Sequence, residues 1–407
     1  MRKLLTILLV SAFALASCSP TTAPVTPVSQ ASPTSHEPPV TPASTPCTLL
    51  HFPVTPEAAL GAAFEGRGHV SGPADAPVTI IVFSDYQCLQ CAFLAASLKQ
   101  IRVTHPKDVR LIYLHAPQTD RDKDDLAIQA VEAADLQGKF WEMHDLLFEK
   151  QADWFAMAPA DFEAWATVQA AGLGIDPIRF GVDFKGTVVD DRLQQAIHSV
   201  GVQPFTPPRL YVNSASPYIA LADFASLDTV VRMDALVARQ FSTCPPESID
   251  PLKQYIVTLH TAKGDVVLQL YPDKAPLAVN NFVFLARRGW YDGITFYQVL
   301  PNDRVMTGDP SETGLGNPGY LFTTEIAAGL DFNQPGMLAL DNNGPSTNGS
   351  RFFITLGSNA QLNGQYTIIG KVLSGLDVLS ALTSRNPQPG IYLPPGDELI
   401  SVSIEER

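Results

Sequence analysis

Cys88 and Cys91 form a C-x-x-C pair directly after an apolar, β-branched segment. Residues 78–83 predict a buried strand, and residues 88–101 carry apolar side chains at helical spacing. The first thiol would then lie at a helix N-terminus, where unpaired N–H groups and the helix dipole stabilise a thiolate. The second thiol lies one turn further on, close enough to resolve a mixed disulfide. The spacing favours thiol–disulfide exchange.

Other roles for this pair stay open from the residues alone. The two cysteines could ligate zinc, but one C-x-x-C supplies two ligands and no second cluster follows it. They could instead form a structural disulfide, or the domain could lack redox activity. We expect Cys88 and Cys91 to be redox-active, as an oxidant or as a reductant.

The segment around the pair resembles the thioredoxin-like family, in its DsbA-like branch with an inserted helical subdomain. The resemblance covers residues 72–241 and includes a second strand at 109–114. It implies a cis-proline opposite the two cysteines, at Pro208, which helps to dock extended substrate. The dipeptide Leu89-Gln90 between the cysteines departs from the family's usual proline-containing pairs, so the resemblance implies no reduction potential.

Two further cysteines, Cys47 and Cys244, stand on either side of this domain. In an oxidising, extracytoplasmic setting two leftover cysteines are more often paired than free. We therefore expect a structural disulfide between Cys47 and Cys244 that closes the ends of the domain. The alternative is that one of them serves as a redox relay with Cys88.

The remainder of the chain predicts a second fold class. Residues 254–272 indicate two alternating strands joined at Lys263-Gly264, and Pro276 begins a helix that runs to Arg288. Short strands then alternate with turns rich in Gly, Pro and Asn, as is typical of a β-barrel or sandwich. Further strands are expected at 294–300, 351–356 and 366–372.

Three phrases in this part resemble the cyclophilins: APLAVNNFVFLARRGWYDGITFYQVLP (275–301), GDP (308–310) and GPSTNGSRFFITLG (344–357). The resemblance covers residues 254–407. It implies a closed barrel capped by helices, with a substrate proline bound on the barrel's outer face. It also implies isomerisation of X-Pro bonds, whose barrier of about 20 kcal/mol falls when a site binds the twisted amide better than either planar isomer.

The family's site is altered in this chain. Gln298 stands where cyclophilins have the catalytic arginine, while Asp303 and Arg304 replace a pocket phenylalanine and methionine. Arg351 stands where the family has glutamine. A neutral amide lacks the charge and the fork of a guanidinium, so we hypothesise that Arg304 or Arg351 supplies the charge from another direction. The alternative is a barrel that binds proline peptides without turnover.

The two resemblances imply a set of site residues. The catalytic ones are Cys88, Cys91, Gln298, Arg304 and Arg351. Phe353 matches the floor of the proline pocket. The implied substrate-binding residues are Pro208, Phe296, Met306, Asn342, Phe353, Leu362 and Tyr366.

The N-terminus predicts export. Arg2 and Lys3 precede an apolar run, 4–15, that has the size of a signal-peptide core and is short for a transmembrane helix. The run ends in LASC, which resembles the bacterial lipobox and implies lipidation of Cys18. The alternative is an ordinary secretory signal with a chance cysteine.

Length and charge agree with this organisation. A chain of 407 residues is expected to hold two domains plus non-globular length, and a net charge of −14 argues against nucleic acid as a partner. We expect a signal peptide at 1–18, a Pro/Thr/Ser-rich tether at 19–62, an α/β thioredoxin-like domain at 63–245 and an all-β cyclophilin-like domain at 250–407.

Together these features predict an extracytoplasmic folding factor anchored to the membrane through a lipid on Cys18. It would act on unfolded or proline-containing exported polypeptides, without a cofactor or metal. The alternative is a proline-binding chaperone or scaffold in which only the thioredoxin-like domain is active.

Overall fold

The computed structural model describes residues 47–50, 64, 66–118, 121–200, 206–213, 223–388 and 390–407. The expected signal peptide, its Cys18 and residues 19–46 of the expected tether lie outside this range. Among the described residues, no helix is long and apolar enough to cross a membrane.

The first module is built on a four-stranded sheet with the order β2-β4-β3-β5. The central strands β3 and β4 run parallel, while β2 and β5 run antiparallel to their neighbours. The central strands are buried along nearly their whole length, which accounts for their continuous apolar sequences. The bounds are β2 His69–Ser71, β3 Val78–Ser84, β4 Val109–His115 and β5 Arg209–Val212.

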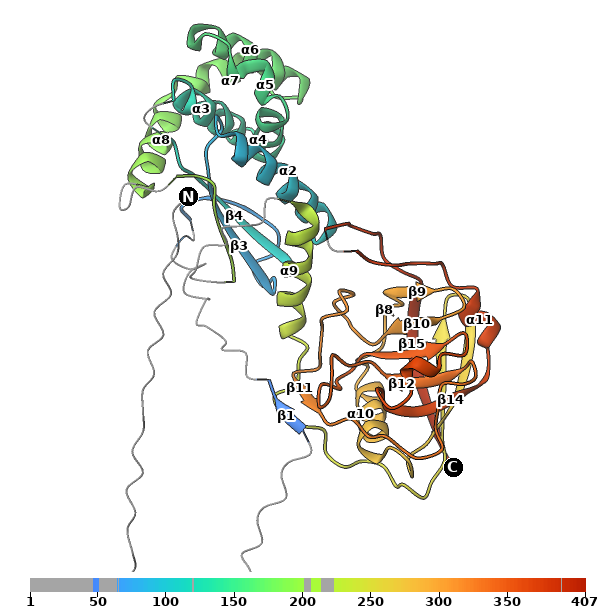
Figure 1. Cartoon of the computed structure of the whole chain (residues 1–407). Coiled ribbons are helices and arrows are strands. Elements are labelled where there is room, and N and C mark those ends of the chain that lie inside the picture. Colours follow the sequence, from blue (N-terminus) through green and yellow to red (C-terminus); the bar gives the residue numbers. More distant parts are fainter. Residues whose placement is uncertain are drawn as a thin grey trace, which may run out of the picture. The chain divides into compact units, whose positions relative to one another are not determined.

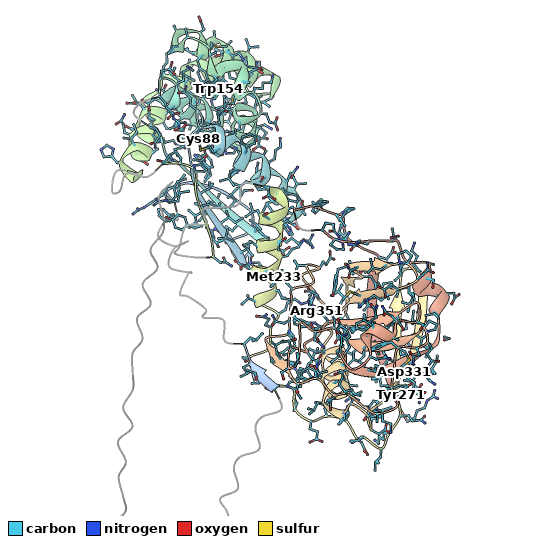
Figure 2. The ribbon with its side chains drawn as sticks, in the orientation of Figure 1. Cys88, Trp154, Met233, Tyr271, Asp331 and Arg351 are labelled. Carbon is cyan, nitrogen blue, oxygen red and sulfur yellow. A yellow bond between two sulfur atoms is a disulfide. The ribbon has the colours of Figure 1, made fainter. Side chains whose placement is uncertain are left out.

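Helices complete this module. Helix α2 follows β3 directly, and six helices inserted between β4 and β5 gather in one cluster beyond the sheet (Figure 1). Trp154, labelled in Figure 2, lies fully buried inside that cluster. The bounds are α2 Leu89–Thr104, α3 Asp124–Asp135, α4 Phe140–Glu149, α5 Gln151–Phe155, α6 Pro159–Gly172, α7 Pro177–Phe184, α8 Thr187–Val200 and, after β5, α9 Phe224–Val237.

The second module is a nine-stranded sheet with the order β8-β15-β6-β7-β14-β12-β13-β10-β9. Helix α10 (Pro276–Arg287) buries its apolar side chains in the core of this module. A second helix, α11 (Leu376–Ser380), and a short 3₁₀ helix, η1 (Ala360–Leu362), follow later in the chain. The strand bounds are β6 Tyr255–Thr261, β7 Gly264–Leu270, β8 Ile294–Thr295, β9 Gln298–Leu300, β10 Arg304–Thr307, β12 Met337–Leu340, β13 Phe352–Thr355, β14 Ile368–Ser374 and β15 Glu398–Glu406.

This sheet is a half-barrel, so the expectation of a closed barrel was wrong. Its two edges are β8 and β9, which are not hydrogen-bonded to each other. Other segments form backbone hydrogen bonds near these edges. Val299 exchanges hydrogen bonds of 2.7 and 3.0 Å with Arg385, and the Phe296 N–H donates to the Asp397 carbonyl at 2.9 Å. Closure depends on which segments reach the edges, and a strand pattern does not reveal that.

A short strand from before the first module joins the second. Strand β1 (Cys47–Leu49) pairs antiparallel with β11 (Tyr320–Phe322), although the sequence analysis placed residues 47–49 in the tether. Cys47 and Cys244 form a disulfide with Cα atoms 6.1 Å apart. Both residues pack with the core of the second module. The expected disulfide is therefore present: it joins the chain before the first module to the chain after it, and it fastens both to the core of the second module.

Candidate functional site

A row of side chains crosses one face of the second sheet. Gln298 of β9 lies opposite Met306 of β10, which lies opposite Phe353 of β13. Phe353 lies opposite Ala339 of β12, and Ala339 lies opposite Ile368 of β14. Residues directly opposite each other in neighbouring strands point to the same face. The five side chains thus form one continuous strip.

Phe353 stands at the centre of a small apolar cluster on this strip. Its buried ring lies 5.7 Å from that of Phe332 in a stacked arrangement and 5.1 Å from that of Tyr366 in an edge-to-face arrangement. The cluster is separate from the main core of the module. It brings together four of the expected substrate-binding residues, Met306, Phe353, Leu362 and Tyr366.

Arg304 lies at the edge of this cluster. It precedes Met306 by two residues on β10 and therefore points to the same face. Its guanidinium carbon is 5.4 Å from the centroid of the Phe353 ring, a cation–π distance, and its Nε donates to Asp303 Oδ2 at 3.1 Å. The side chain is 18% exposed. A peptide seated on Phe353 would therefore meet the guanidinium.

Arg351 has a different environment. Its side chain is 10% exposed, and its guanidinium lies 3.1 Å from Asp341 Oδ2. It also donates to Asn343 Oδ1 at 3.2 Å and to the Gly314 carbonyl. Burial raises the pKa of Asp341, and the charges of Arg351 and Arg304 oppose that rise. The donors of Arg351 thus bind groups within the module, whereas Arg304 lies at the Phe353 cluster. The catalytic role expected of each stays a prediction.

The other expected residues of the cyclophilin domain, Gln298, Asn342 and Phe296, have different surroundings. Gln298 is half-buried, and its Nε2 donates to Asn386 Oδ1 at 3.0 Å. Asn342 Nδ2 donates to the Gln365 carbonyl at 3.2 Å. Phe296 packs in the main core and not in the Phe353 cluster, and its substrate-binding role stays a prediction.

In the first module the structure brings together Cys88, Cys91 and Pro208. Cys88 is the residue before α2, its sulfur accepts the Cys91 N–H at 3.1 Å, and the two cysteines form a disulfide (Figure 2). The peptide bond between Pro207 and Pro208 is cis, and the Pro207 carbonyl oxygen is 3.6 Å from Cys88 Sγ. The helix N-terminus offers a thiolate the N–H groups that the sequence analysis expects.

The second module matches the model of the cyclophilin-type peptidyl-prolyl cis-trans isomerases over residues 256–392. Peptidyl-prolyl cis-trans isomerase CYP18-1 of Arabidopsis thaliana is 42% identical over 137 residues, which are 33% of this chain and 86% of that protein. The chain belongs to the cyclophilin family.

Other similarities were also found. Peptidyl-prolyl cis-trans isomerase B of Streptomyces anulatus is 39% identical over 173 residues, covering 38% of this chain and 99% of that protein. A crystal structure of a cyclophilin-type isomerase from Cryptosporidium parvum is 30% identical, covers 38% of this chain and 98% of that chain, and has a TM-score of 0.34. The first module matches a thioredoxin family model over residues 65–207. A thioredoxin-like domain therefore precedes the cyclophilin domain.

One group of potential metal ligands lies outside the cyclophilin domain. His69, His115 and Glu132 have ligand atoms within 4.8 Å of one another. Both imidazoles already bond to Glu132 Oε1, at 2.6 and 2.9 Å, and Arg192 bonds to Oε2 at 2.8 Å. Burial alone would raise the pKa of Glu132, but the hydrogen bonds from the two histidines outweigh burial and lower it. The group is a polar network that fixes β2 and β4 to α3, and within the described part of the chain the buried Nδ1 of His115 has no hydrogen-bond partner.

Several residues at these sites escaped the sequence analysis. In the cyclophilin domain they are Asp341, which neutralises Arg351, and Asn386, which holds Gln298. A charged residue directly before the expected Asn342 is a signal that could have revealed Asp341. In the thioredoxin-like domain they are Asp85 and Asp124, both buried close to Cys88 in the fold. The sequence carries no signal that these two carboxyls meet.

Proposed function

We propose that this chain is an extracytoplasmic, lipid-anchored folding factor whose cyclophilin domain isomerises X-Pro bonds, with Arg304 in the role of the family's arginine. One observation carries the proposal: the Arg304 guanidinium lies 5.4 Å from the centroid of Phe353, on the strip that also holds Gln298 and Met306. An apolar floor and an adjacent cation are what this reaction needs from a protein.

The proposed chemistry breaks no bond. The proline ring packs on Phe353, beside Met306 and Leu362, and Arg304 donates hydrogen bonds to the peptide around the rotating amide. A twisted amide has lost its resonance, so its nitrogen and oxygen accept hydrogen bonds differently from a planar amide, and donors that favour the twisted form lower the barrier. The Gln298 amide, held by Asn386, is a second donor on the same strip.

Exchange of an Ala-Pro peptide measured by NMR tests this function. We expect the natural chain to accelerate exchange and Gln298→Arg to change the rate by less than about tenfold, because Arg304 already supplies the charge. The full chain should be used, since β1, Leu236 and Cys244 pack on the cyclophilin core and a fragment from residue 250 would lose them. No acceleration by the natural chain, with activity in Gln298→Arg, would indicate a cyclophilin domain that binds proline peptides without turnover.

For the thioredoxin-like domain we propose thiol–disulfide exchange with polypeptide clients. An open groove of about 580 Å³ lies beside Cys88, and its apolar lining includes Leu89 and Phe155, which are 59% and 44% exposed. A client thiolate attacks Cys88 Sγ, the Cys88–Cys91 bond breaks, and Cys91 leaves as a thiolate that takes up a proton. A second client thiolate attacks the client sulfur of the mixed disulfide and releases Cys88. The client dithiol is oxidised and the domain is reduced, and the reverse sequence reduces a client disulfide.

The location is also a proposal, supported by the LASC phrase and by the Pro-, Thr- and Ser-rich segment after it. Cys18→Ser should release the chain from the membrane fraction and abolish incorporation of labelled palmitate in a lipoprotein-processing bacterium. A chain that stays membrane-bound and unlabelled in both forms would contradict the lipid anchor.

A further inference from the structure

Two buried aspartates meet beside the turn that carries Cys88. Asp85 precedes Cys88 by three residues, and Asp124 is the first residue of α3. Each residue is 2% exposed. The Gln87 N–H donates to Asp85 Oδ1 at 2.7 Å and lies 3.4 Å from Asp124 Oδ1. The two carboxyls therefore meet at the same N–H group.

Among the residues that the structure describes, their hydrogen bonds leave one oxygen without a donor. Asp124 Oδ2 accepts the Gln118 N–H at 2.8 Å, and Asp85 Oδ1 accepts from Arg121 Nη1 at 2.9 Å. Asp85 Oδ2 is buried and has no such partner. A buried carboxylate oxygen without a donor is costly. A proton held between the two carboxyls removes that cost.

The surrounding charges also favour one retained proton. Arg121 is the cation that faces the pair, because Lys123 bonds to Asp122 instead, at 2.7 Å. From β4, burial raises the pKa of the Tyr113 phenol, which keeps it neutral. Burial, together with the hydrogen bond from Asp85, raises the pKa of Asp124 to about 8. Two carboxyls that share one guanidinium and one proton are balanced, whereas two carboxylates would leave a buried charge.

We propose that Asp85 and Asp124 share one proton, which keeps the negative charge beside Cys88 low. The pair thereby sets how readily the Cys88–Cys91 disulfide is reduced, and the two aspartates are positioning residues for thiol–disulfide exchange. The inference rests on the exchange chemistry proposed above. Reduction places negative charge on Cys88, and loss of the shared proton adds a second negative charge nearby. The two charges disfavour each other, so the carboxyl pair holds its proton more tightly in the reduced protein than in the oxidised one.

The test compares redox equilibria of the full-length natural chain and Asp124→Asn in glutathione buffers from about pH 6 to pH 9. At pH 6 the natural pair carries a single negative charge, and in Asp124→Asn the Asp85 carboxylate carries the same charge beside a neutral amide. The equilibrium constants should therefore agree at this pH. Above about pH 8 the natural pair gains a charge, and Asp124→Asn should be easier to reduce by roughly three- to tenfold. Titration of glutathione itself affects both proteins equally, so it cancels in the ratio of their equilibrium constants.

Asp125→Asn is the matched control, since it removes a neighbouring, exposed carboxylate of α3 outside the pair and should shift the equilibrium equally at every pH. If the ratio of the equilibrium constants for reduction of the natural chain and of Asp124→Asn does not change with pH, the proposal is overturned. If Asp124→Asn fails to fold, infrared spectra of the natural chain decide: a protonated carboxyl band at pH 6 that is lost by pH 9 supports the pair, and its absence at pH 6 overturns it. No client takes part, so failure of client exchange would be a separate result against the proposed function.

Discussion

Replacing Arg304 with alanine should lower kcat/KM for X-Pro isomerisation by about 100-fold or more, the usual cost of deleting one donor that acts on the transition state. The guanidinium lies over Phe353 on the strip that the proline would occupy, and within the described part of the cyclophilin domain the other candidate cation, Arg351, binds internal partners. The measurement is NMR exchange of an Ala-Pro peptide with the full chain. The effect should fall mainly on turnover, because Phe353 still binds the proline ring.

Two variants make this result interpretable. Arg304→Lys keeps the positive charge without the planar fork and should fall between the natural chain and Arg304→Ala. Arg288→Ala removes another arginine that lies over a ring, 5.5 Å from the centroid of Phe284, which packs in the main core. It should leave the rate unchanged. Full activity in Arg304→Ala would mean that Gln298 alone suffices, and the proposed role of Arg304 would be wrong.

The parts of these sites that could be predicted from sequence are set by short-range geometry. Cys88 and Cys91 lie within one helical turn, and the strand–turn–helix pattern of residues 78–101 places them at a helix N-terminus. The order of the two domains follows from short, nearly contiguous motifs: the C-x-x-C segment for the first domain and the cyclophilin phrases for the second. In such stretches each side chain's environment depends on neighbours that the sequence displays.

The features that escaped prediction depend on contacts between distant segments. Both Arg304 and Arg351 stood as candidates, and the difference between them is that Asp341, ten residues before Arg351, turns inward to meet it. Phe296 is two residues from Gln298 yet packs into the main core. Strand β1 pairs with β11 across more than 270 residues of sequence. Nothing local to these residues reveals which segment they meet.

Replacing Arg351 with alanine should destabilise the cyclophilin domain by about 3–5 kcal/mol, because it leaves a buried carboxylate without its cation. Asp341 is 8% exposed, and the Gly314 carbonyl and Asn343 lose a donor as well. Urea unfolding, with hydrogen exchange of the β12 and β13 amides to report on this domain, measures the loss. Arg288→Ala is the control, and we expect it to cost no more than about 1 kcal/mol because this exposed arginine does not act on Asp341.

The pH dependence of the stability lost in Arg351→Ala distinguishes a lost ion pair from lost packing. Burial raises the pKa of Asp341 in the natural domain, and without Arg351 to oppose burial the pKa rises further. A carboxyl whose pKa is higher in the folded than in the unfolded state binds protons more tightly when folded, so its penalty is present at neutral pH and is relieved as the pH falls through the folded-state pKa. The difference in free energy of unfolding between the natural chain and Arg351→Ala should therefore become smaller as the pH falls from 7 to 5. Adding Asp341→Asn should recover part of the loss at pH 7, because the amide carries no charge to bury. A deficit that is constant with pH, and that Asp341→Asn does not reduce, would mean that Arg351 stabilises the domain by packing and not by neutralising Asp341.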